Sequence, residues 1–496
     1  MNTFEMVSPE SLGIARKGIE DFLTAAAKAG LELHRLMILR HGRCCAKITW
    51  SPYGEEDLHP VYSFSKSLTA TAIGFAWQEG LLTLDEKIAD LFPEDLPPVP
   101  DENLLSCTIH HLLCMSCGHE TAQWDSSPSW RKSFFAQPFL HKPGSFYLYN
   151  TAGSNLLACI IKKKTGMQVT EYLKDRLFVP LGMSDVYCAE LPDEYHTQIG
   201  GAGMKLKLED MARFTQFMLQ DGFWEGKPLL KGWFMAQAGT KQIETAGDSE
   251  GHIKEWAKGY GYQCWMGSFP GSFRADGAYG QFGLVYPGLD TCIIINAATE
   301  QTQTIMDAVN NCLLPNISGD EGTSPGQDDP TLQPLIREYS LPVLLSCRNP
   351  VFEEKLNHSV YRVVDGSAMC GLRQLVGGAG LFETFGPDPV SEIRFCFREG
   401  LTEMLLTEGS TVYKLAAATD GRFAFSEAGG IRYAACARWR SLRRLEMEIR
   451  RTDAMSGVRL IFSFSDANME IETDETLMSE GGLGMICRPL SSFRLG

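Results

Sequence analysis

Residues 63–66 read Ser-Phe-Ser-Lys, and the small and apolar residues 68–77 follow at once. This run predicts a helix that begins near Ser63. Residues three apart on a helix are surface neighbours with Cβ atoms roughly 5–6 Å apart, so the amine of Lys66 can reach the hydroxyl of Ser63. The start of a helix also offers unpaired N–H groups and a partial positive charge, which favour a developing oxyanion. The pair therefore predicts a nucleophile with its own activator. The same residues also fit a simpler interpretation, in which Ser63 is a helix N-cap and Lys66 is solvated.

Length and composition describe an ordinary globular protein with a large core. The chain has 496 residues, of which 44% are hydrophobic and 21% are charged. This length suggests about three domain-sized units. The net charge of -16 disfavours nucleic acids and anionic membranes as partners.

The first residues carry no basic segment followed by an apolar one, so no signal peptide is visible. An uninterrupted apolar run of transmembrane length is also missing from the sequence. The 15 cysteines are an odd number and lie in apolar segments, for example at Cys159, Cys292 and Cys396. Reduced thiols fit this pattern better than a disulfide framework. We therefore expect a cytoplasmic protein without a membrane partner.

The first 316 residues mix helical and strand patterns, which predicts an α/β (α+β) domain. A tight turn at His41-Gly42 separates the first two expected strands, and Thr83 with Asp85 gives a capping signal for a helix. We expect strands at 36–40, 46–50, 281–286 and 291–295, and helices from Ser63 to Glu79-Gly80, from 82–88 onward, at 155–164 and at 303–314.

Beyond a polar stretch rich in Gly and Pro, the pattern changes to short runs of alternating residues. Leu445, Met447 and Ile449 alternate with charged neighbours, and residues 458–464 repeat this period of two. Such runs indicate an antiparallel barrel or sandwich. We expect a mixed α/β domain at 1–316, a linker at 317–333 and a C-terminal all-β domain at 334–496. The last of these shows no catalytic constellation, and its role is not indicated.

Three motifs follow one another in the first part of the chain. They are Ser63 to Lys66 with residues 80–88, the run Ile-His-His-Leu-Leu-Cys-Met-Ser-Cys-Gly at 109–118, and Pro-Gly-Ser-Phe-Tyr-Leu-Tyr-Asn-Thr at 143–151. In this order they resemble the serine β-lactamase and penicillin-binding-protein superfamily, specifically its class C and family VIII esterase branch. The resemblance covers about residues 8–315. It implies an antiparallel sheet flanked by helices, with an added helical subdomain.

The resemblance also implies a catalytic tyrosine. The apolar pair Leu156-Leu157 sets the register of the family's helix, which places the family tyrosine at Tyr149 rather than Tyr147 and the family asparagine at Thr151. A nearby cation lowers the pKa of a phenol, so Tyr149 can take the proton of Ser63 and later pass it to the leaving group. Thr151 keeps a hydroxyl on the substrate side of the site but lacks the two-donor amide of asparagine.

The family's Lys-Thr-Gly motif is altered. Residues 164–166 spell it, but they end an apolar helix only 15 residues beyond Tyr149, where Lys and Gly are common helix terminators. Residues 274–282 stand at the expected place in the order of motifs, and Ala275-Asp276-Gly277 replaces Lys-Thr-Gly there. The usual contact of the lysine with a substrate carboxylate is therefore missing, and Arg274 is a candidate replacement.

The resemblance assigns Asp276, Gly277 and Ala278 to the oxyanion and substrate side of the site. Backbone N–H groups near Gly277 or Ala278 can complete an oxyanion hole with the N–H of Ser63, because that task needs no side chain. Asp276 also has a simpler interpretation as a turn residue before Gly277, and this alternative is favoured.

Histidines and cysteines gather in one stretch, at His110, His111, Cys114, Cys117 and His119. A zinc site needs four converging ligands, and the chain offers no second Cys-x-x-Cys. We expect neither a metal nor a cofactor. The aromatic residues of 260–269 fit an acyl pocket and half-buried strand positions equally well.

These features predict a serine hydrolase that acts through an acyl-enzyme on Ser63. The expected substrate is a small-molecule ester or amide, as for an esterase or a small amidase. A β-lactamase, a D-aminopeptidase-like peptidase and a catalytically weak binding or scaffold member remain alternatives. The missing Lys-Thr-Gly lysine counts against β-lactam hydrolysis, and the sequence gives no oligomeric state.

Overall fold

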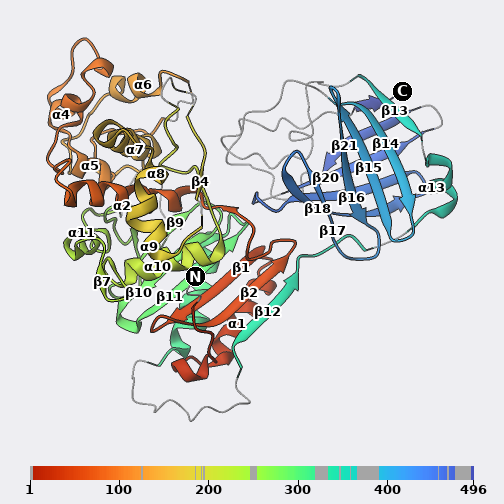
Figure 1. The fold of residues 1–496 in the computed structure, drawn as a ribbon, viewed down its shortest axis with the longest axis horizontal. Helices are drawn as coiled ribbons and strands as arrows, with labels where there is room; N and C mark the ends of the chain where they lie inside the picture. Colours follow the sequence, from red (N-terminus) through yellow and green to blue (C-terminus); the bar gives the residue numbers. More distant parts are fainter. Residues whose placement is uncertain are drawn as a thin grey trace. The chain divides into compact units, whose positions relative to one another are not determined.

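Figure 1 shows the computed structural model of the chain, which describes residues 4–123, 127–184, 186–191, 193, 196–245, 254–318, 333–345, 348–357, 359–365, 390–455, 457–465, 468–474 and 493–495. The chain divides into two compact units. Met1–Ile48 and Val61–Arg337 form the first, and Thr49–Pro60 with Glu338–Gly496 form the second. Our limits for the domains stay a prediction, and most of the expected linker, 317–333, lies outside the described residues.

A seven-stranded sheet forms the centre of the first unit, in the order β12-β2-β1-β11-β10-β9-β8. Its strands are β1 (Leu33–Arg40), β2 (Arg43–Ser51), β8 (Trp265–Met266), β9 (Phe273–Gly277), β10 (Gln281–Tyr286), β11 (Thr291–Ala297) and β12 (Leu335–Ser340). The pairs β1–β11, β11–β10, β10–β9 and β9–β8 are antiparallel. All residues of β10 and β11 are buried, as expected for strands covered on both faces. His41 and Gly42 both have positive φ, which suits the tight turn between β1 and β2.

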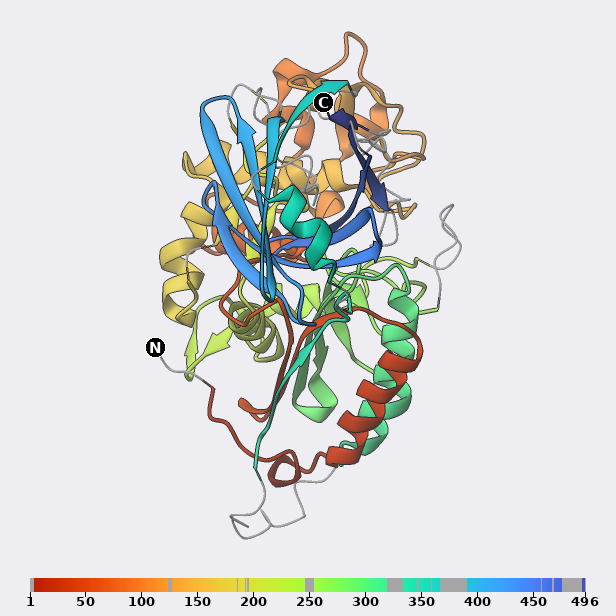
Figure 2. The ribbon, with the colours of Figure 1, turned by 90° about the vertical axis from the view of Figure 1, so that its right-hand side faces the viewer.

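Helices cover both faces of this sheet (Figure 2). On one face α1 (Arg16–Lys28) packs with α12 (Thr302–Ala308) and the π-helix Val309–Leu313. On the other face α10 (Leu208–Leu219) lies against β10 and β11. Phe214 of α10 meets the ring of Phe64 with centroids 5.8 Å apart, and a Cβ on Gly283 of β10 would lie 2.8 Å from the Phe64 ring. The glycine therefore lets the segment that carries Ser63 pack directly on the sheet.

A helical subdomain stands beside the sheet, with α2 (Ser65–Gln78) and α7 (Thr151–Thr165) packed against each other at its centre. Around them lie α4 (Glu102–Ser106), α5 (Ile109–Leu113), α6 (Trp130–Ala136), α8 (Val169–Leu173) and α11 (Gly232–Ala238). Twelve consecutive residues of α2 are buried, which explains its small side chains: a Cβ on Gly74 would lie 2.7 Å from the ring of Phe234. None of the described helices combines the length and the hydropathy that a membrane span requires.

The prediction of a helix from residue 82 onward is wrong. Residues 83–86 form a turn, and only α3 (Ile88–Leu91) is helical. The backbone hydrogen bonds of this segment go to another part of the chain: Ile88 N donates to Cys107 O, and His110 N donates to Leu84 O. The capping signal is real but local, since Thr83 N donates to the carboxylate of Glu86 at 2.8 Å.

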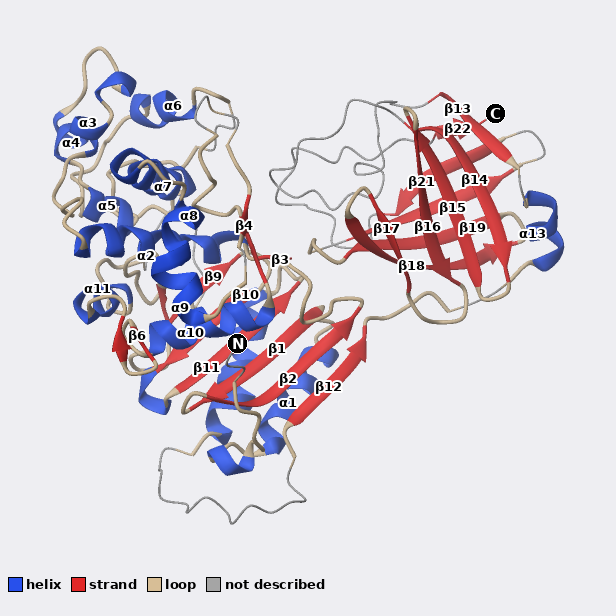
Figure 3. Ribbon diagram, viewed as in Figure 1, coloured by secondary structure: helices blue, strands red, loops and turns tan. Residues whose placement is uncertain are grey.

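The second unit is a ten-stranded sheet that curls into a nearly closed barrel (Figure 3). Its strands are β13 (Val360–Asp365), β14 (Val390–Arg398), β15 (Leu401–Glu408), β16 (Thr411–Ala418), β17 (Ala424–Ala428), β18 (Ile431–Ser441), β19 (Arg444–Arg451), β20 (Gly457–Phe464), β21 (Met469–Asp474) and β22 (Phe493–Leu495). Ala418 of β16 also bridges Cys436 of β18 and so returns the sheet towards its start. The predicted fold class is confirmed, with a barrel in place of the sandwich alternative.

The two faces of β19 differ in the way that the sequence alternation predicts. Leu445, Met447 and Ile449 lie in the barrel core. On the opposite face Glu446 is 0% and Glu448 is 2% exposed. Guanidinium groups surround these two carboxylates: Arg450 and Arg459 contact Glu448 at 2.7 and 2.9 Å, and Arg438 contacts Glu446 at 2.7 Å. The charged face is therefore a buried network of ion pairs.

Residues 49–60 belong to the barrel unit although they precede Ser63, which the sequence did not lead us to expect. Tyr53 is buried in an apolar cluster with Leu341 and Leu344, and its hydroxyl donates to Met455 O at 3.2 Å. Asp57 pairs with Arg432 at 3.2 Å. The barrel unit is thus completed by a segment from the N-terminal part of the chain.

Candidate active site

Ser63 lies half-buried in the 3₁₀ turn Tyr62–Phe64, immediately before α2. The preceding residue, Tyr62, has a φ of 45°, which is left-handed backbone that a non-glycine residue rarely adopts. Such strain costs on the order of 1–3 kcal/mol and persists only where the surroundings enforce it. The ring of Tyr62 meets that of Tyr279 at 5.5 Å, and Tyr279 also has positive φ. The serine therefore stands on a turn that packing holds in a fixed shape.

Lys66 is 1% exposed, which rules out the solvated lysine of the simpler interpretation. Its Nζ lies 2.9 Å from Ser63 Oγ, 3.2 Å from Thr151 Oγ1 and 2.6 Å from the carbonyl oxygen of Gly201. These three partners are oxygens without a formal charge. The structure therefore brings together Ser63 from its 3₁₀ turn, Lys66 from α2 and Thr151 from α7.

Burial lowers the pKa of Lys66 from its ordinary 10.5 to about 7, and the negative charge of Asp276 opposes this shift. Near neutral pH a large fraction of the side chain is thus a neutral amine with two N–H groups and one lone pair. The Gly201 carbonyl can only accept, and the Thr151 hydroxyl can accept the second N–H. The lone pair is then left for the proton of Ser63.

A second set of residues holds these partners in place. Helix α7 begins at Thr151 because Asn150 caps it, with Oδ1 accepting from the backbone N–H of Ala152 at 3.0 Å. Asn155, one turn further on, accepts from Gly201 N at 2.9 Å. A Cβ on Gly201 would lie 2.7 Å from Thr151 Cγ2, so only glycine lets its carbonyl reach Lys66. Sequence reasoning missed both Asn155 and Gly201; the pair Gly200-Gly201 was the available signal.

Tyr149 is the tyrosine that the structure brings to Lys66. The Lys66 Nζ lies 4.9 Å from the centroid of the Tyr149 ring. Trp265 stacks on this ring with centroids 5.5 Å apart. Tyr147 is instead buried in a cluster with Tyr260 and Trp265. The aromatic stretch after residue 260 therefore supports Tyr149 by packing.

Strand β9 ends directly beside the turn that carries Ser63. A Cβ on Gly277 would lie 2.1 Å from the carbonyl oxygen of Val61, two residues before the serine. A side chain at this position would force the two backbones apart. Ala278 follows the end of the strand and is exposed. Gly277 thus lies at the site by backbone contact, as a motif without a side-chain role requires.

Asp276 is a strand residue, so its interpretation as a turn residue is wrong. Arg274 Nε donates to its carboxylate at 2.8 Å. Burial raises the pKa of Asp276, and the charge of Arg274 works against this. Arg274 is itself buried, lies 4.6 Å from the Trp256 ring and donates to the Met266 carbonyl at 3.1 Å. Its guanidinium is therefore committed to this network and not placed for a substrate carboxylate.

The histidines of 109–119 have local partners. His110 Nδ1 lies 2.9 Å from the hydroxyl of Tyr262, and His111 Nδ1 accepts from Thr108 N at 3.0 Å in the cap of α5. Among the residues that the structure describes, no three His, Cys, Asp or Glu side chains form a group that could hold a metal ion. The literal Lys-Thr-Gly at 164–166 is the end of α7, where Gly166 has a φ of 74°.

Comparison with known proteins agrees with this fold. The profile of the beta-lactamase family matches residues 28–310, which is more than half of the chain. The 6-aminohexanoate-dimer hydrolase of Paenarthrobacter ureafaciens is 24% identical over 281 residues, which cover 52% of this chain and 70% of that protein. Lovastatin esterase of Penicillium rubens is 24% identical over 161 residues, covering 27% of this chain and 40% of the esterase.

A solved structure shares the fold of the first unit. The putative beta-lactamase from Bacteroides dorei superposes with a TM-score of 0.51 at 14% identity, over 60% of this chain and 99% of that one. At this identity the likeness concerns the fold alone. The family profile, which spans the Ser63 turn, α2, α7 and strand β9, decides the assignment: the chain belongs to the beta-lactamase family of hydrolases.

Proposed function

We propose that the protein is a serine hydrolase of small esters or amides that acts through an acyl-enzyme on Ser63. The observation that carries this proposal is the buried amine of Lys66, 2.9 Å from Ser63 Oγ and bonded to neutral oxygens. A buried amine with a pKa near 7 is suited to take up a proton at neutral pH.

In the proposed first step Ser63 Oγ forms a bond to the substrate carbonyl carbon, and its proton passes to Lys66. The bond from that carbon to the leaving oxygen or nitrogen then breaks, and the leaving group takes a proton from Lys66 or Tyr149. A water molecule resolves the acyl-enzyme in the same way: its oxygen bonds to the carbonyl carbon, its proton passes to the same base, and Ser63 leaves with a proton.

Tyr149 has the second role in this scheme. Its ring lies 4.9 Å from the Lys66 nitrogen, so a protonated lysine would stabilise a developing phenolate. We expect Tyr149→Phe to slow acylation by roughly 10²- to 10⁴-fold, the range for loss of a general acid or base. Near-normal acylation in Tyr149→Phe would place the proton transfer on Lys66 alone.

The developing oxyanion would be bound by backbone N–H groups. Ser63 supplies one at the start of its turn, and the strand end at Gly277 and Ala278 is the proposed source of the other. This assignment rests on the close approach of Gly277 to Val61, which leaves no room for a side chain between strand and turn.

The proposed substrate class follows from what the β9 side of the site offers. Ala275 stands in place of the usual lysine, and Arg274 is buried and bonded to Asp276. No cation other than Lys66 is therefore offered by the described residues of this strand and the Ser63 turn. An uncharged ester or small amide fits such a site better than a β-lactam with its carboxylate, and lovastatin esterase is among the relatives.

We also propose that the protein works in a reducing compartment such as the cytoplasm. All cysteines within the described ranges are free thiols, and most of them are buried. Disulfides would be expected among so many cysteines in an oxidising environment.

Fluorophosphonate labelling tests the proposal directly. Wild type should label and should turn over p-nitrophenyl acetate or butyrate, and Ser63→Ala should do neither. Ser65→Ala is the matched control. Ser65 lies in the same tetrapeptide as Ser63, but its hydroxyl accepts a hydrogen bond from Met204 N. A wild type that neither labels at Ser63 nor turns over these esters would sink the proposal and favour a binding or scaffold role. If the wild type does label at Ser63, nitrocefin hydrolysis separates an esterase from a β-lactamase.

A further inference from the structure

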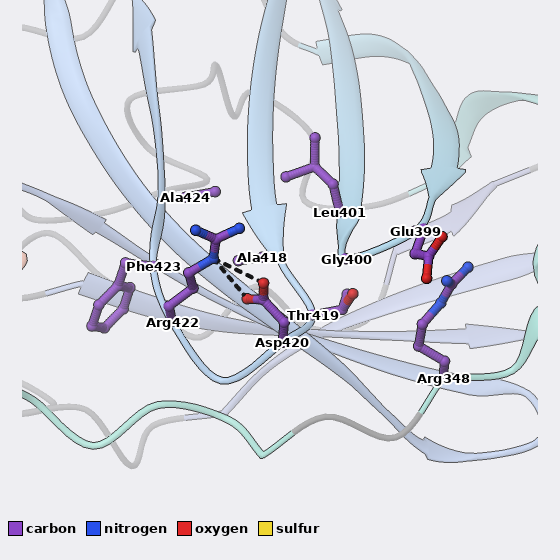
Figure 4. A pocket seen from close by; sticks show the side chains of 10 residues that line it. All are labelled: Arg348, Glu399, Gly400, Leu401, Ala418, Thr419, Asp420, Arg422, Phe423 and Ala424. Carbon is purple, nitrogen blue, oxygen red and sulfur yellow. Dashed lines mark hydrogen bonds and ion pairs between the residues drawn. The ribbon is translucent and has the colours of Figure 1, made fainter.

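Residues at the hairpin ends of the barrel unit surround a hollow at its surface (Figure 4). Arg422 and Asp420 at its wall are exposed and paired with each other, because Arg422 Nε donates to both carboxylate oxygens at 3.0 and 2.8 Å. An exposed pair of this kind has a modest effect on stability, and we place no site there. The polar side chain that connects the most elements around Ser63 lies in the first unit, at Gln263.

Gln263 lies in the loop before β8 and is only 2% exposed, yet all of its polar groups are hydrogen-bonded. Its Nε2 donates to the carbonyl oxygens of Leu112 and Leu113 at 3.0 and 3.1 Å, and its backbone N–H donates to Leu113 O at 3.0 Å. Its Oε1 accepts from Ser154 Oγ at 2.7 Å, and its carbonyl oxygen accepts from Ser67 Oγ at 2.7 Å. A buried polar network that is fully satisfied holds its members in one arrangement.

The partners of Gln263 belong to three helices around the candidate active site. Ser67 of α2 is the residue after Lys66, and Ser154 of α7 lies one turn after Thr151. The carbonyl groups belong to the end of α5, where the last carbonyls of a helix lack partners within the helix. Gln263 therefore joins α2, α5 and α7 at one point.

The end of α5 leads to the segment that carries Tyr149. Met115 O accepts from Leu148 N at 2.9 Å, and Met115 Sδ accepts from Asn150 N at 3.2 Å. These two hydrogen bonds hold the residues on either side of Tyr149. The position of Tyr149 therefore depends on the end of α5, which Gln263 holds.

The backbone of Gln263 is strained. Its φ is 54°, in the left-handed region that favours glycine. Residues with a side chain keep such a conformation only where the surroundings enforce it, and they gather at functional sites. A glycine here would relieve the strain but would lose the hydrogen bonds of Nε2 and Oε1. The presence of glutamine indicates that these side-chain bonds outweigh the strain.

We propose that Gln263 is a positioning residue for the reaction on Ser63, which keeps Lys66, Thr151 and Tyr149 in place by joining α2, α5 and α7. This inference rests on the proposed serine hydrolase function. In this role Gln263 does not touch the reacting atoms and acts through the three helices. A misplacement of about 1 Å at reacting groups can cost on the order of 10²-fold in rate, so a small movement of α7 against α2 is enough.

Gln263→Gly tests the proposal, because glycine accepts this backbone conformation and only the side-chain bonds are lost. We expect kcat for p-nitrophenyl butyrate to fall by about 10- to 100-fold, with KM changed by less than about threefold. Ser154→Ala removes a single bond of the amide and should lower kcat by about 3- to 10-fold. When it is added to Gln263→Gly it should cause no further loss, because its partner is already gone.

Gln78→Ala is the matched control. The Gln78 amide also donates to a carbonyl, Leu229 O at 3.0 Å, and accepts from a backbone N–H, that of Lys231 at 2.7 Å. It stands at the far end of α2 from Lys66. Gln78→Ala should lower the melting temperature but leave kcat and its pH dependence unchanged.

The pH profile separates positioning from a merely structural role. Burial holds the pKa of Lys66 at about 7, and the amine faces Asp276 of β9 and the Tyr149 ring, which none of these substitutions alters. If α2 and α7 separate, water reaches the amine and favours its charged form. The acid limb of kcat/KM should therefore move from about pH 7 to at least about pH 7.5 in Gln263→Gly. Wild-type kcat and an unmoved limb in both Gln263→Gly and Ser154→Ala overturn the proposal.

A measurement that needs no turnover distinguishes a failure of this proposal from a failure of the hydrolase function. Between the pKa values of folded and unfolded Lys66, a protein with Lys66 gains stability with rising pH relative to its Lys66→Met counterpart. In urea unfolding this gain should begin near pH 7 in the wild-type background, and at least about half a pH unit higher with Gln263→Gly or Ser154→Ala. If Gln263→Gly does not fold, Ser154→Ala decides both measurements. If wild type shows no turnover, the hydrolase function fails, and an onset that stays near pH 7 in the variants overturns the positioning of Lys66 by Gln263 as well.

Discussion

The outer face of β19 and the surroundings of Lys66 both bury charged side chains, but they do so in opposite ways. In the barrel, Glu446 and Glu448 are buried on the outer face of β19, and guanidinium groups contact both of them. In the first unit, Lys66 is buried as deeply, and its nitrogen is hydrogen-bonded to two hydroxyls and a backbone carbonyl.

The difference lies in the partners. A buried charge with ionic partners stabilises the fold, whereas a buried amine with uncharged partners can lose its proton near neutral pH. Removing an ion from water costs several kcal/mol unless an opposite charge and further hydrogen bonds offset it. The barrel pairs supply that offset. Around Lys66 the offset is incomplete, so the pKa falls and the proton becomes exchangeable at neutral pH. Uncharged hydrogen-bond partners around its buried amine are thus the feature by which the proposed catalytic role of Lys66 differs from a structural one.

The largest expected effect comes from removing the reactive amine. Lys66→Met should lower kcat for p-nitrophenyl butyrate by about 10³- to 10⁴-fold, because Ser63 loses its proposed base. The fold should remain, since a buried amine is replaced by an apolar chain of similar length. Steady-state kinetics with a thermal melt checks both parts, and Lys17→Met, exposed on α1, is the control. A variant that unfolds would assign Lys66 to the structural class of the barrel charges.

The next prediction concerns pH. Folded Lys66 has a pKa of about 7 and unfolded Lys66 its ordinary 10.5, so between these values the unfolded chain binds a proton that the folded one does not. The stability of wild type should therefore rise across this range relative to Lys66→Met, by up to roughly 5 kcal/mol. Below pH 7 both states are protonated and the full burial penalty is present. Urea unfolding of the two proteins from pH 6 to 10 measures this difference; parallel curves would contradict the lowered pKa. Activity should likewise rise with pH through about 7.

In the barrel the corresponding test is to break a pair. Glu448→Leu leaves the buried guanidinium of Arg450 without its carboxylate at 2.7 Å, and should cost about 3–5 kcal/mol of unfolding free energy. Glu472→Leu is the matched control, because its pair with Arg444 is half exposed and should contribute under about 1 kcal/mol. Equal losses in the two variants would show that burial does not set the value of these pairs. Chemical denaturation measures both.

The smallest effect should come from the backbone beside the serine. Gly277→Ala places a methyl group where Val61 O lies 2.1 Å away, so β9 and the Ser63 turn must separate. We expect kcat/KM to fall by about 10²-fold, as for loss of an oxyanion donor. Gly288→Ala is the control, since no atom lies within 4 Å of its added Cβ. An active Gly277→Ala would move the oxyanion donor away from this strand.

Much of the fold could be predicted from the sequence because its signals are local. The strands around His41-Gly42, the pair β10–β11, helix α7 and the alternation of β19 each depend on nearby residues. The prediction of a helix at residues 82–88 failed because their backbone hydrogen-bond partners lie at residues 107–110, and no local pattern reveals that pairing. The motif order likewise placed Tyr149 within reach of Lys66, whereas Asn155 and Gly201 act through contacts that only the fold creates.

Asp276 shows a second limit of sequence reasoning. An aspartate before a glycine is typical of a turn. Here the carboxylate is held within a strand by Arg274, two residues earlier on the same face, and this partner decides its conformation. The grouping of residues 49–60 with the barrel was out of reach for the same reason: Tyr53 and Met455 are 402 residues apart in the chain.

That last contact bears on how the protein is made. During synthesis residues 49–60 leave the ribosome before any of residues 338–496. Tyr53 therefore cannot form its contact with Met455 until most of the chain has been synthesised. Closing so long a loop costs entropy that grows with the logarithm of its length. The first unit can fold before the barrel unit. Residues 49–60 are then already joined to it at both ends when the barrel folds. A C-terminal fragment cut at residue 337 would lack twelve residues of its own unit, so the barrel cannot be cloned intact as one continuous stretch.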